Sequence, residues 1–298
     1  MGVRMKHIFL NLKRFDIPRE YGGVNSIAAP AEWGGAIVSK TQDELRPYAG
    51  EAEFAMYFPE AHLVGAAAAR SADSPVQIGC QGVFREDTAV GGPFGAFTTN
   101  RPAHAAKALG ATTVLIGHCE ERRDLLGVLA EGGVTGGAAS AAVNRILQKE
   151  VERALAAGLS VLYCIGETSE EQPRWQEVLR EQIEIGLQGA GKAARGDAAD
   201  GGKAGAAKIC IAYEPVWAIG PGKTPPDRDY IVKIASYLKE ITGGLPVVYG
   251  GGLKTDNAAM LASIPEIDGG LIALTRFSGE IGFYPEEYLE IVRTYLEA

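Results

Sequence analysis

Residues 209–224 of this chain read ICIAYEPVWAIGPGKT, and this stretch is the most informative part of the sequence. Its first six residues form an apolar run that ends in a carboxylate, Glu214, and a stiff Pro-Val-Trp follows. Gly220 and Gly222 come next, on either side of a proline. This order predicts an acidic side chain at the end of a β-strand, followed by a loop whose glycines let its tip approach a ligand closely.

Similar short apolar runs recur along the chain and predict eight β-strands. They are residues 8–12, 52–57, 76–81, 113–117, 160–165, 208–214, 245–249 and 269–273. Helical hydrophobic spacing occurs between them, for example in residues 141–157, 173–187, 228–241 and 256–263. Strands that alternate with helices favour a parallel sheet, and in a chain of 298 residues this count favours a closed barrel. We therefore expect a single α/β domain over residues 1–298, a (β/α)8 barrel.

Two segments interrupt this alternation. Residues 189–207 are rich in Gly, Ala, Lys and Asp and lack large apolar side chains, so we expect a flexible surface insertion before the sixth strand. A linker between two domains is the alternative, but the strands on both sides are needed to close one barrel. The glycine-rich residues 131–140 predict a second extended surface loop.

Composition argues against several classes of function. The net charge of −8 argues against sequence-independent binding of nucleic acid, although a few local cations and amides can still hold an anionic small molecule. The four cysteines show no CxxC pair and no metal-ligand spacing, so we expect reduced, structural thiols. We find no secretory signal and no apolar run of membrane-spanning length, and we therefore expect a cytoplasmic protein without membrane contact.

Chemically active residues follow several of the predicted strands. In a barrel the carboxyl ends of the strands form the active face. Asn11 and Lys13 share one side of the first strand, His118 follows the fourth and Glu214 ends the sixth. A carboxylate can remove a carbon-bound proton, an imidazole can polarise a carbonyl oxygen, and an ammonium can offset enediolate charge. The residues after His118 resemble a first helical turn, and a helix N-terminus disfavours the charged imidazolium.

These residues stand in motifs that resemble the triosephosphate isomerase family. The motifs are Asn11-Leu-Lys13, residues 114–123 (VLIGHCEERR), 164–167 (CIGE), 212–224, 249–251 (YGG) and 256–259 (DNAA). The resemblance spans the whole chain, and the match at residues 212–224 is highly specific. It implies a glycolytic and gluconeogenic isomerase that interconverts glyceraldehyde 3-phosphate and dihydroxyacetone phosphate through an enediolate, without a metal or an organic cofactor.

The resemblance also implies roles for individual residues. Glu214 corresponds to the base and His118 to the neutral electrophile. Lys13 corresponds to the electrostatic residue, and Asn11 to its positioning neighbour. Residues 218–223 correspond to a lid that closes over the substrate.

Three acidic residues near this set differ in how they are interpreted. Glu120 corresponds to the acid that follows the histidine in the family, and we expect it to contact Lys13. This chain has an extra acidic residue there, Glu121, which is the alternative. Glu167 is interpreted as a structural residue that bonds backbone or a cation near the lid, and Trp217 as a packing residue that anchors the lid.

The positions that correspond to phosphate binding depart from the family pattern. The substrate-binding residues implied by the resemblance are Gly220, Gly250, Gly251, Gly252, Ala273, Leu274 and Arg276. Gly252 replaces a serine, and Ala273 and Leu274 replace two glycines whose amides approach the phosphate, so their Cβ atoms crowd that site. Arg276 can supply a charge-assisted contact instead.

The proton-transfer residues are therefore complete, whereas the anion-binding residues are altered. Two alternatives stay open: an isomerase of another short sugar phosphate, for example one of four carbons, and a non-catalytic sugar-phosphate sensor. A complete proton-transfer set argues against the sensor. Residues 92–102 keep the family's Gly-Ala-Phe-Thr but not the Gly-Glu that follows it. In the family this loop enters the neighbouring subunit, which implies a homodimer with altered contacts.

Overall fold

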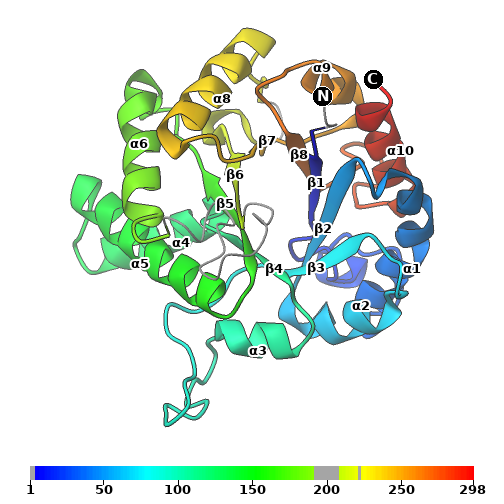
Figure 1. Cartoon of the computed structure of the whole chain (residues 1–298), viewed down its shortest axis with the longest axis horizontal. Coiled ribbons are helices and arrows are strands. Elements are labelled where there is room, and N and C mark those ends of the chain that lie inside the picture. Colours follow the sequence, from blue (N-terminus) through cyan, green and yellow to red (C-terminus); the bar gives the residue numbers. More distant parts are fainter. Residues whose placement is uncertain (1–3, 191–207, 221–222) are drawn as a thin grey trace, which may run out of the picture.

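The computed structural model describes residues 4–190, 208–220 and 223–298. Its centre is a closed barrel of parallel strands, in which each strand pairs with the next and the last pairs with the first (Figure 1). The strands are β1 (Lys6–Asn11), β2 (Ala52–Phe58), β3 (Val76–Cys80), β4 (Thr113–Ile116), β5 (Ser160–Ile165), β6 (Ile209–Tyr213), β7 (Val247–Tyr249) and β8 (Gly269–Ile272). The predicted (β/α)8 barrel is confirmed. Of the insertion expected at residues 189–207, residues 191–207 lie outside the described residues.

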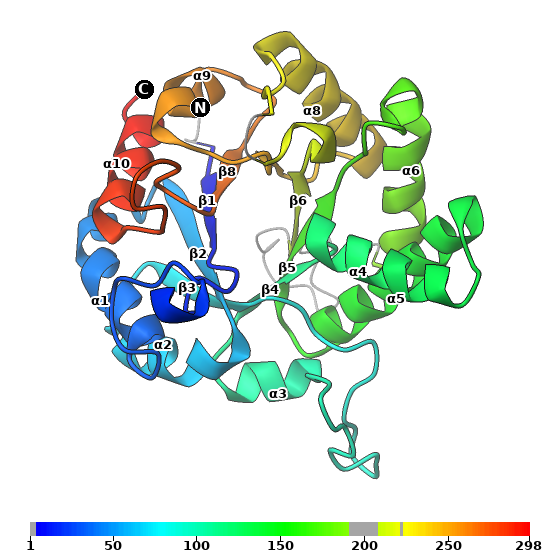
Figure 2. The ribbon, with the colours of Figure 1, turned by 180° about the vertical axis from the view of Figure 1, so that it is seen from behind.

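Helices surround this barrel on its outer face (Figures 1 and 2). They are α1 (Trp33–Leu45), α2 (Leu63–Ala69), α3 (Ala103–Ala108), α4 (Cys119–Glu131), α5 (Gly136–Ala156), α6 (Trp175–Gly186), α8 (Arg228–Thr242), α9 (Thr255–Ala262) and α10 (Pro285–Leu296). Short 3-10 turns lie in the connections, namely η1 (Arg19–Tyr21), η2 (Arg46–Tyr48), η3 (Glu60–His62), η4 (Gln172–Arg174) and η5 (Val216–Ala218). Among the helices so described, none combines the length and the apolar character needed to cross a bilayer.

One sequence expectation about the helices was wrong. Residues 136–140 were expected in a glycine-rich loop, but they form the first turns of α5. Ala138 and Ala139 are strong helix formers and join the apolar pattern that follows, which outweighs the unfavourable propensity of Gly136 and Gly137.

Alternate residues of the strands fill the inside of the barrel. They are Phe9, Ala55, Tyr57, Leu115, Leu162, Cys164, Cys210, Ala212, Val248 and Leu271. The intervening strand residues belong to the larger core beneath the helices. Because side chains alternate with a period of two, the next inward position after Phe9 is Asn11, and the next after Ala212 is Glu214. The same alternation that builds the interior therefore points both residues into the barrel mouth.

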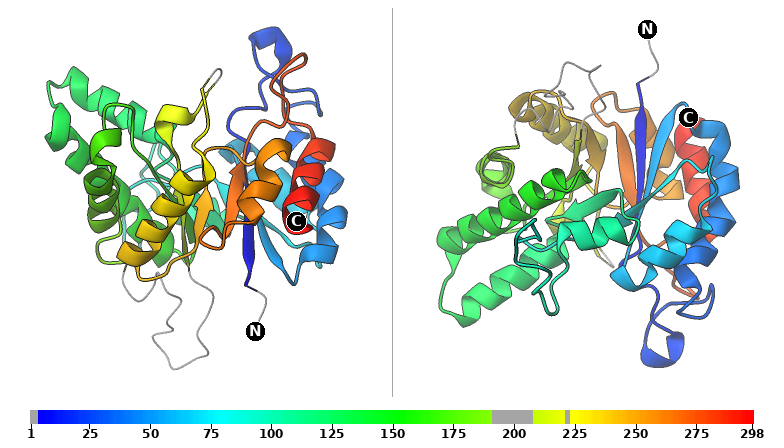
Figure 3. Two further views of the ribbon diagram at one scale, coloured as in Figure 1. Left: turned by 90° about the horizontal axis from the view of Figure 1, so that it is seen from above. Right: turned by 60° about the horizontal axis from the view of Figure 1, so that its bottom comes forward.

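Two long connections rise beside each other above one side of this mouth (Figure 3). Residues 12–32 connect β1 to α1, and residues 273–284 connect β8 to α10. Arg19 of the first connection donates a hydrogen bond to the hydroxyl of Tyr284 in the second, at 3.2 Å. Segments from opposite ends of the chain thus form one raised edge next to the strand ends.

A third connection, between β3 and α3, projects away from the barrel (Figures 1 and 2). Its outer residues include Val90 and Phe94, which are 109% and 86% exposed. Large apolar side chains held in solvent on a projecting loop are typical of a contact with another protein.

Candidate active site

A cavity of about 460 Å³ opens at the carboxyl ends of β1, β3 and β4. Its lining residues are Asn11, Lys13, Arg14, Phe15, Gln81, Leu115, His118, Glu120 and Glu121. The fold therefore brings four of the predicted catalytic residues to one cavity, although they come from distant parts of the chain.

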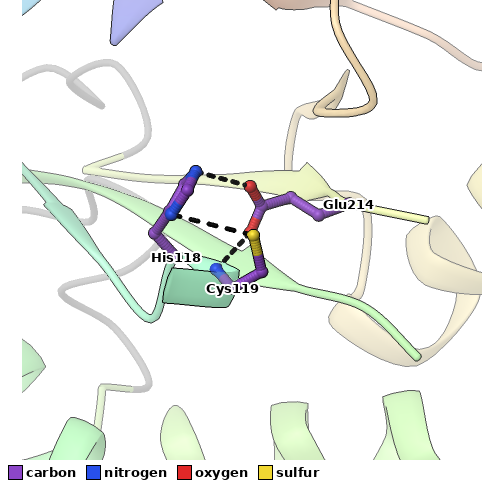
Figure 4. Close-up of side chains that lie close together, drawn as sticks. All are labelled: His118, Cys119 and Glu214. Atoms are coloured by element: carbon purple, nitrogen blue, oxygen red, sulfur yellow. Dashed lines mark hydrogen bonds and ion pairs between the residues drawn. The ribbon is translucent and has the colours of Figure 1, made fainter. Parts of the chain in front are cut away.

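Glu214, the fifth predicted catalytic residue, lies beside His118 (Figure 4). Its Oε1 is 3.1 Å from Nε2 of His118, and its Oε2 accepts the backbone N–H of Cys119 at 2.9 Å. Glu214 is only 2% exposed, and this burial raises the pKa of its carboxyl, against the opposing effects of His118 and the Cys119 amide. A carboxylate with a raised pKa is a stronger base, which suits removal of a carbon-bound proton.

His118 stands at the start of the helix that follows it. It is the N-cap of α4, where its Nδ1 accepts the backbone N–H of Glu120 at 3.2 Å. An accepting Nδ1 carries no proton, so the ring hydrogen is assigned to Nε2, which faces Glu214. Protonation of Nδ1 would set this group against the N–H groups and the positive end of the helix dipole. The helix expected after His118 is present as α4.

Lys13 is presented to the cavity by an unusual backbone conformation. Its φ is 39°, in the left-handed region that a lysine rarely adopts. The N–H of Lys13 donates to Oδ1 of Asn11 at 3.0 Å, and its carbonyl accepts from Nε2 of Gln81 at 3.0 Å. Its ammonium lies 2.8 Å from Oε1 of Glu120. Asn11 thus positions Lys13, and the acidic contact comes from Glu120 and not from Glu121.

Comparison with known proteins identifies the family of this chain. A family model described as triosephosphate isomerase matches residues 34–293. The chain belongs to the triosephosphate isomerase family. Triosephosphate isomerase from Geobacter metallireducens is 38% identical over 211 residues, which are 67% of this chain and 71% of that protein. The protein of the same name from Halorhodospira halophila is 33% identical over 271 residues, which are 88% of this chain and 93% of that protein.

A solved structure supports the same fold. The crystal structure of triosephosphate isomerase from Bartonella henselae matches with a TM-score of 0.67, over 98% of this chain and 99% of that chain. The sequence identity in this match is 23%, so it supports the barrel architecture alone.

Gln81 is a further polar residue of this cavity, and the sequence analysis did not predict it. It directly follows β3, and its Nε2 lies within hydrogen-bond distance of the carbonyls of Lys13 and Tyr57, each at 3.0 Å. A polar residue at the end of a predicted strand was the criterion that selected Asn11 and Glu214. The same criterion, applied to the third strand, would have found Gln81.

The segment before the expected lid is anchored on Glu167. Oε1 of this buried residue accepts hydrogen bonds from the Tyr213 hydroxyl at 2.9 Å, Nε1 of Trp217 at 2.8 Å and the Tyr230 hydroxyl at 3.1 Å. Burial raises the pKa of Glu167, and the three donors oppose this effect. Glu167 thus has the contacts of a structural residue: three aromatic donors and a backbone hydrogen bond, and no cation among the described residues. Residues 221–222, in the expected lid, lie outside the described residues.

The glycines after β7 are required by packing. A Cβ on Gly250 would lie 2.8 Å from Cγ of Glu214, and one on Gly251 would overlap the Tyr249 hydroxyl. Gly252 has a φ of 100°, which side-chain-bearing residues rarely adopt. Gly250 therefore leaves room for the Glu214 side chain, a reason that the sequence motif did not reveal.

The residues after β8 were expected to take part in substrate binding. Ala273 and Leu274 are half-buried. Arg276 lies 3.8 Å from the centroid of the Tyr284 ring, and its Nε donates to Glu287 at 2.8 Å. An anion at Arg276 would thus compete with Glu287 for the guanidinium.

Three side chains of the site have donor atoms close enough to suggest a metal centre. These atoms of His118, Cys119 and Glu214 lie within 4.8 Å of one another. Hydrogen bonds already use both ring nitrogens of His118 and both oxygens of Glu214. Burial, assisted by Glu214, raises the pKa of the Cys119 thiol to about 12, which disfavours the thiolate that a metal requires. This arrangement suits proton transfer better than metal ligation.

Proposed function

We propose that this protein interconverts glyceraldehyde 3-phosphate and dihydroxyacetone phosphate through an enediolate, with Glu214 as the base and without a metal or an organic cofactor. The observation that carries this proposal is the contact at 3.1 Å between the buried Glu214 carboxylate and Nε2 of His118. It occurs in a chain whose match to the triosephosphate isomerase model covers residues 34–293.

In the proposed mechanism Glu214, His118 and Lys13 each act on the substrate, and the same three groups serve both directions of the reaction. Glu214 removes the proton from the carbon next to the carbonyl, and the electrons move into an enediolate. His118 donates its Nε2 hydrogen to the carbonyl oxygen and later recovers a proton from the neighbouring oxygen. The ammonium of Lys13 offsets the negative charge that develops on these oxygens. Return of the proton to the adjacent carbon by Glu214 completes the exchange of aldose and ketose.

The phosphate of the substrate would lie on the far side of Glu214 from Lys13. The family resemblance assigns it to Gly220, to Gly251 and Gly252, and to the residues after β8. The N–H groups of Gly251 and Gly252 donate to no acceptor in the described part of the chain, which supports this placement. In this proposal the side chains of Ala273 and Leu274 narrow the site, and Arg276 would contact the phosphate in competition with Glu287, with which it is ion-paired.

We also propose that the protein is a cytoplasmic homodimer that acts in glycolysis and gluconeogenesis. The dimer is supported by the projecting connection before α3, which presents Val90 and Phe94 to solvent. The cytoplasmic location follows from the pathway of the family.

The proposal is tested first by proton exchange in heavy water. Incubation with phosphorylated and unphosphorylated sugars of three to five carbons should place deuterium in the triose phosphates and yield the isomeric product. Turnover of a tetrose phosphate in preference to the triose phosphates would support the longer-substrate isomerase. Tight binding without deuterium incorporation from any of these sugars would support the sensor.

The Glu214→Asp variant tests the base directly. It withdraws the carboxylate by one methylene, and a misplacement of about 1 Å can cost about 100-fold in kcat. We expect KM to change little, because the change acts on the chemical step. Steady-state kinetics in both directions measure the effect, and wild-type turnover would remove Glu214 from the mechanism.

A further inference from the structure

One lysine lies beside the position where this chain lacks the family's serine. A Cβ added to Gly252 would lie 3.6 Å from Cε of Lys254. The charged end of the Lys254 side chain is therefore in contact distance of the place where a side chain at position 252 would begin. The chain thus has a glycine where the family has a hydroxyl, and an ammonium group next to that glycine.

The turn that carries Lys254 is fixed by contacts of its backbone. Oδ1 of Asn257 accepts the N–H of Lys254 at 2.8 Å, and Nδ2 of Asn257 donates to the carbonyl of Gly252 at 2.9 Å. The N–H of Leu253 donates to the carbonyl of Leu271 at 3.0 Å, which joins the turn to β8. None of these contacts uses the Lys254 side chain, so a substitution at residue 254 leaves them in place.

The ammonium of Lys254 is held in place without being neutralised. Its Nζ lies 4.2 Å from the centroid of the Phe277 ring, on the connection between β8 and α10. An aromatic face attracts a cation but carries no net charge. In the described part of the chain no carboxylate forms an ion pair with Lys254, whereas Arg276 is ion-paired with Glu287. An anion can therefore bind Lys254 without displacing a carboxylate.

We propose that Lys254 supplies a positive charge to the phosphate site and binds the phosphate of the substrate. The proposal rests on the function proposed above and adds a residue to the same site. Lys254 lies in the turn whose Gly251 and Gly252 N–H groups donate to no acceptor among the described residues. A phosphate bound at this turn would accept hydrogen bonds from two backbone N–H groups and one ammonium. The ammonium interacts with the net charge of the phosphate, so it favours phosphorylated over neutral sugars.

Lys254→Met tests this role, because it removes the charge and keeps a long, flexible side chain beside Phe277. A hydrogen bond to a charged group contributes enough to change an affinity by about tenfold or more. The ratio of kcat/KM for glyceraldehyde 3-phosphate to kcat/KM for unphosphorylated glyceraldehyde should therefore fall by about tenfold. A lysine that only stabilises the fold would change both kcat/KM values by the same factor, which would leave the ratio unchanged.

Lys233→Met is the matched control. Nζ of Lys233, on α8, lies 4.8 Å from the centroid of the Trp175 ring. This variant therefore loses the same charge and the same kind of aromatic contact, outside the proposed phosphate site. Its ratio of the two kcat/KM values should equal that of the wild type.

Inorganic phosphate gives a second readout that needs no turnover. A ligand that binds only the folded protein raises the Tm. At one phosphate concentration, the Tm of the wild type and of Lys233→Met should rise by the same amount, and that of Lys254→Met should rise less. Sodium chloride at the same ionic strength corrects for the general effect of salt.

An unchanged ratio in Lys254→Met, or an equal fall of the ratio in both lysine variants, would overturn the proposal. A wild type whose Tm does not respond to phosphate would also overturn it. If the wild type isomerises no triose phosphate, the function proposed above fails, while the comparison of Tm values still decides whether Lys254 binds phosphate. Lys254→Gln replaces Lys254→Met in both measurements if the methionine variant does not fold.

Discussion

At the scale of single residues, the position of the catalytic base depends on a backbone N–H. Cys119 is the first residue of α4, and its amide donates to Glu214, while its thiol lies 3.8 Å from Nδ1 of His118. Proline is well tolerated at this helical position, and the extended conformation of His118 (φ −51°, ψ 147°) suits a residue before proline. Cys119→Pro therefore deletes one donor with little damage to the helix.

We expect Cys119→Pro to raise the pKa of Glu214, because this N–H stabilises only the carboxylate. Hydrogen bonds to charged groups contribute about 1.5–3 kcal/mol, which corresponds to about one to two pH units. Since the base must be ionised, the acid limb of the kcat/KM profile should move to higher pH by that amount. Cys119→Ser keeps the amide and serves as the control, and identical acid limbs in the two variants would contradict this account.

At the scale of elements, the carboxylate of Glu167 joins the segment before the expected lid to the barrel and to α8. Glu167 follows β5 and accepts a hydrogen bond from Tyr213, which ends β6. Trp217 lies on η5 and Tyr230 lies on α8, so four elements meet at Oε1 of Glu167. Asp227 caps α8 by accepting the N–H of Tyr230, which fixes the helix end that presents this hydroxyl. The start of the lid is therefore tied to α8 as well as to the barrel.

Tyr230→Phe should lower the free energy of unfolding by about 2 kcal/mol, because it removes a donor to a buried charged acceptor. Urea denaturation at neutral pH measures the loss. Tyr237→Phe is a matched control on the same helix, since its hydroxyl donates to the neutral carbonyl of Gln176 at an exposed position. The control should lose less than about 1 kcal/mol. Equal losses of unfolding free energy in the two variants would mean that the hydrogen bond from Tyr230 to Glu167 stabilises the fold no more than the exposed hydrogen bond of Tyr237.

At the scale of the whole molecule, strand order and the active face followed from the sequence because both depend on local periodicity. The choice of Glu120 over Glu121 came from the family resemblance and not from periodicity, because neighbouring helical residues point about 100° apart and the outcome depends on where α4 begins. The Nδ1 cap of His118 sets that beginning. The contact of Arg19 with Tyr284 was also beyond prediction, because it joins two irregular segments from opposite ends of the chain.

The projecting connection before α3 leads to a prediction about the assembly. Phe94 is 86% exposed, and a homodimer would place this apolar ring against a second copy. Phe94→Asp introduces a charge that would have to be desolvated at the contact, so it should weaken association and yield monomers at micromolar concentration.

Sedimentation velocity over a concentration series measures this effect. Ile281→Ser is a control for loss of exposed apolar surface, because Ile281 is 44% exposed on the connection between β8 and α10. This connection lies across the barrel from the projecting loop (Figure 1), so the control should keep the wild-type mass. A monomeric wild type, or a Phe94→Asp variant that remains dimeric at the lowest concentration, would show that the loop is not the contact. The exposed ring of Phe94 would then indicate a contact with a different protein.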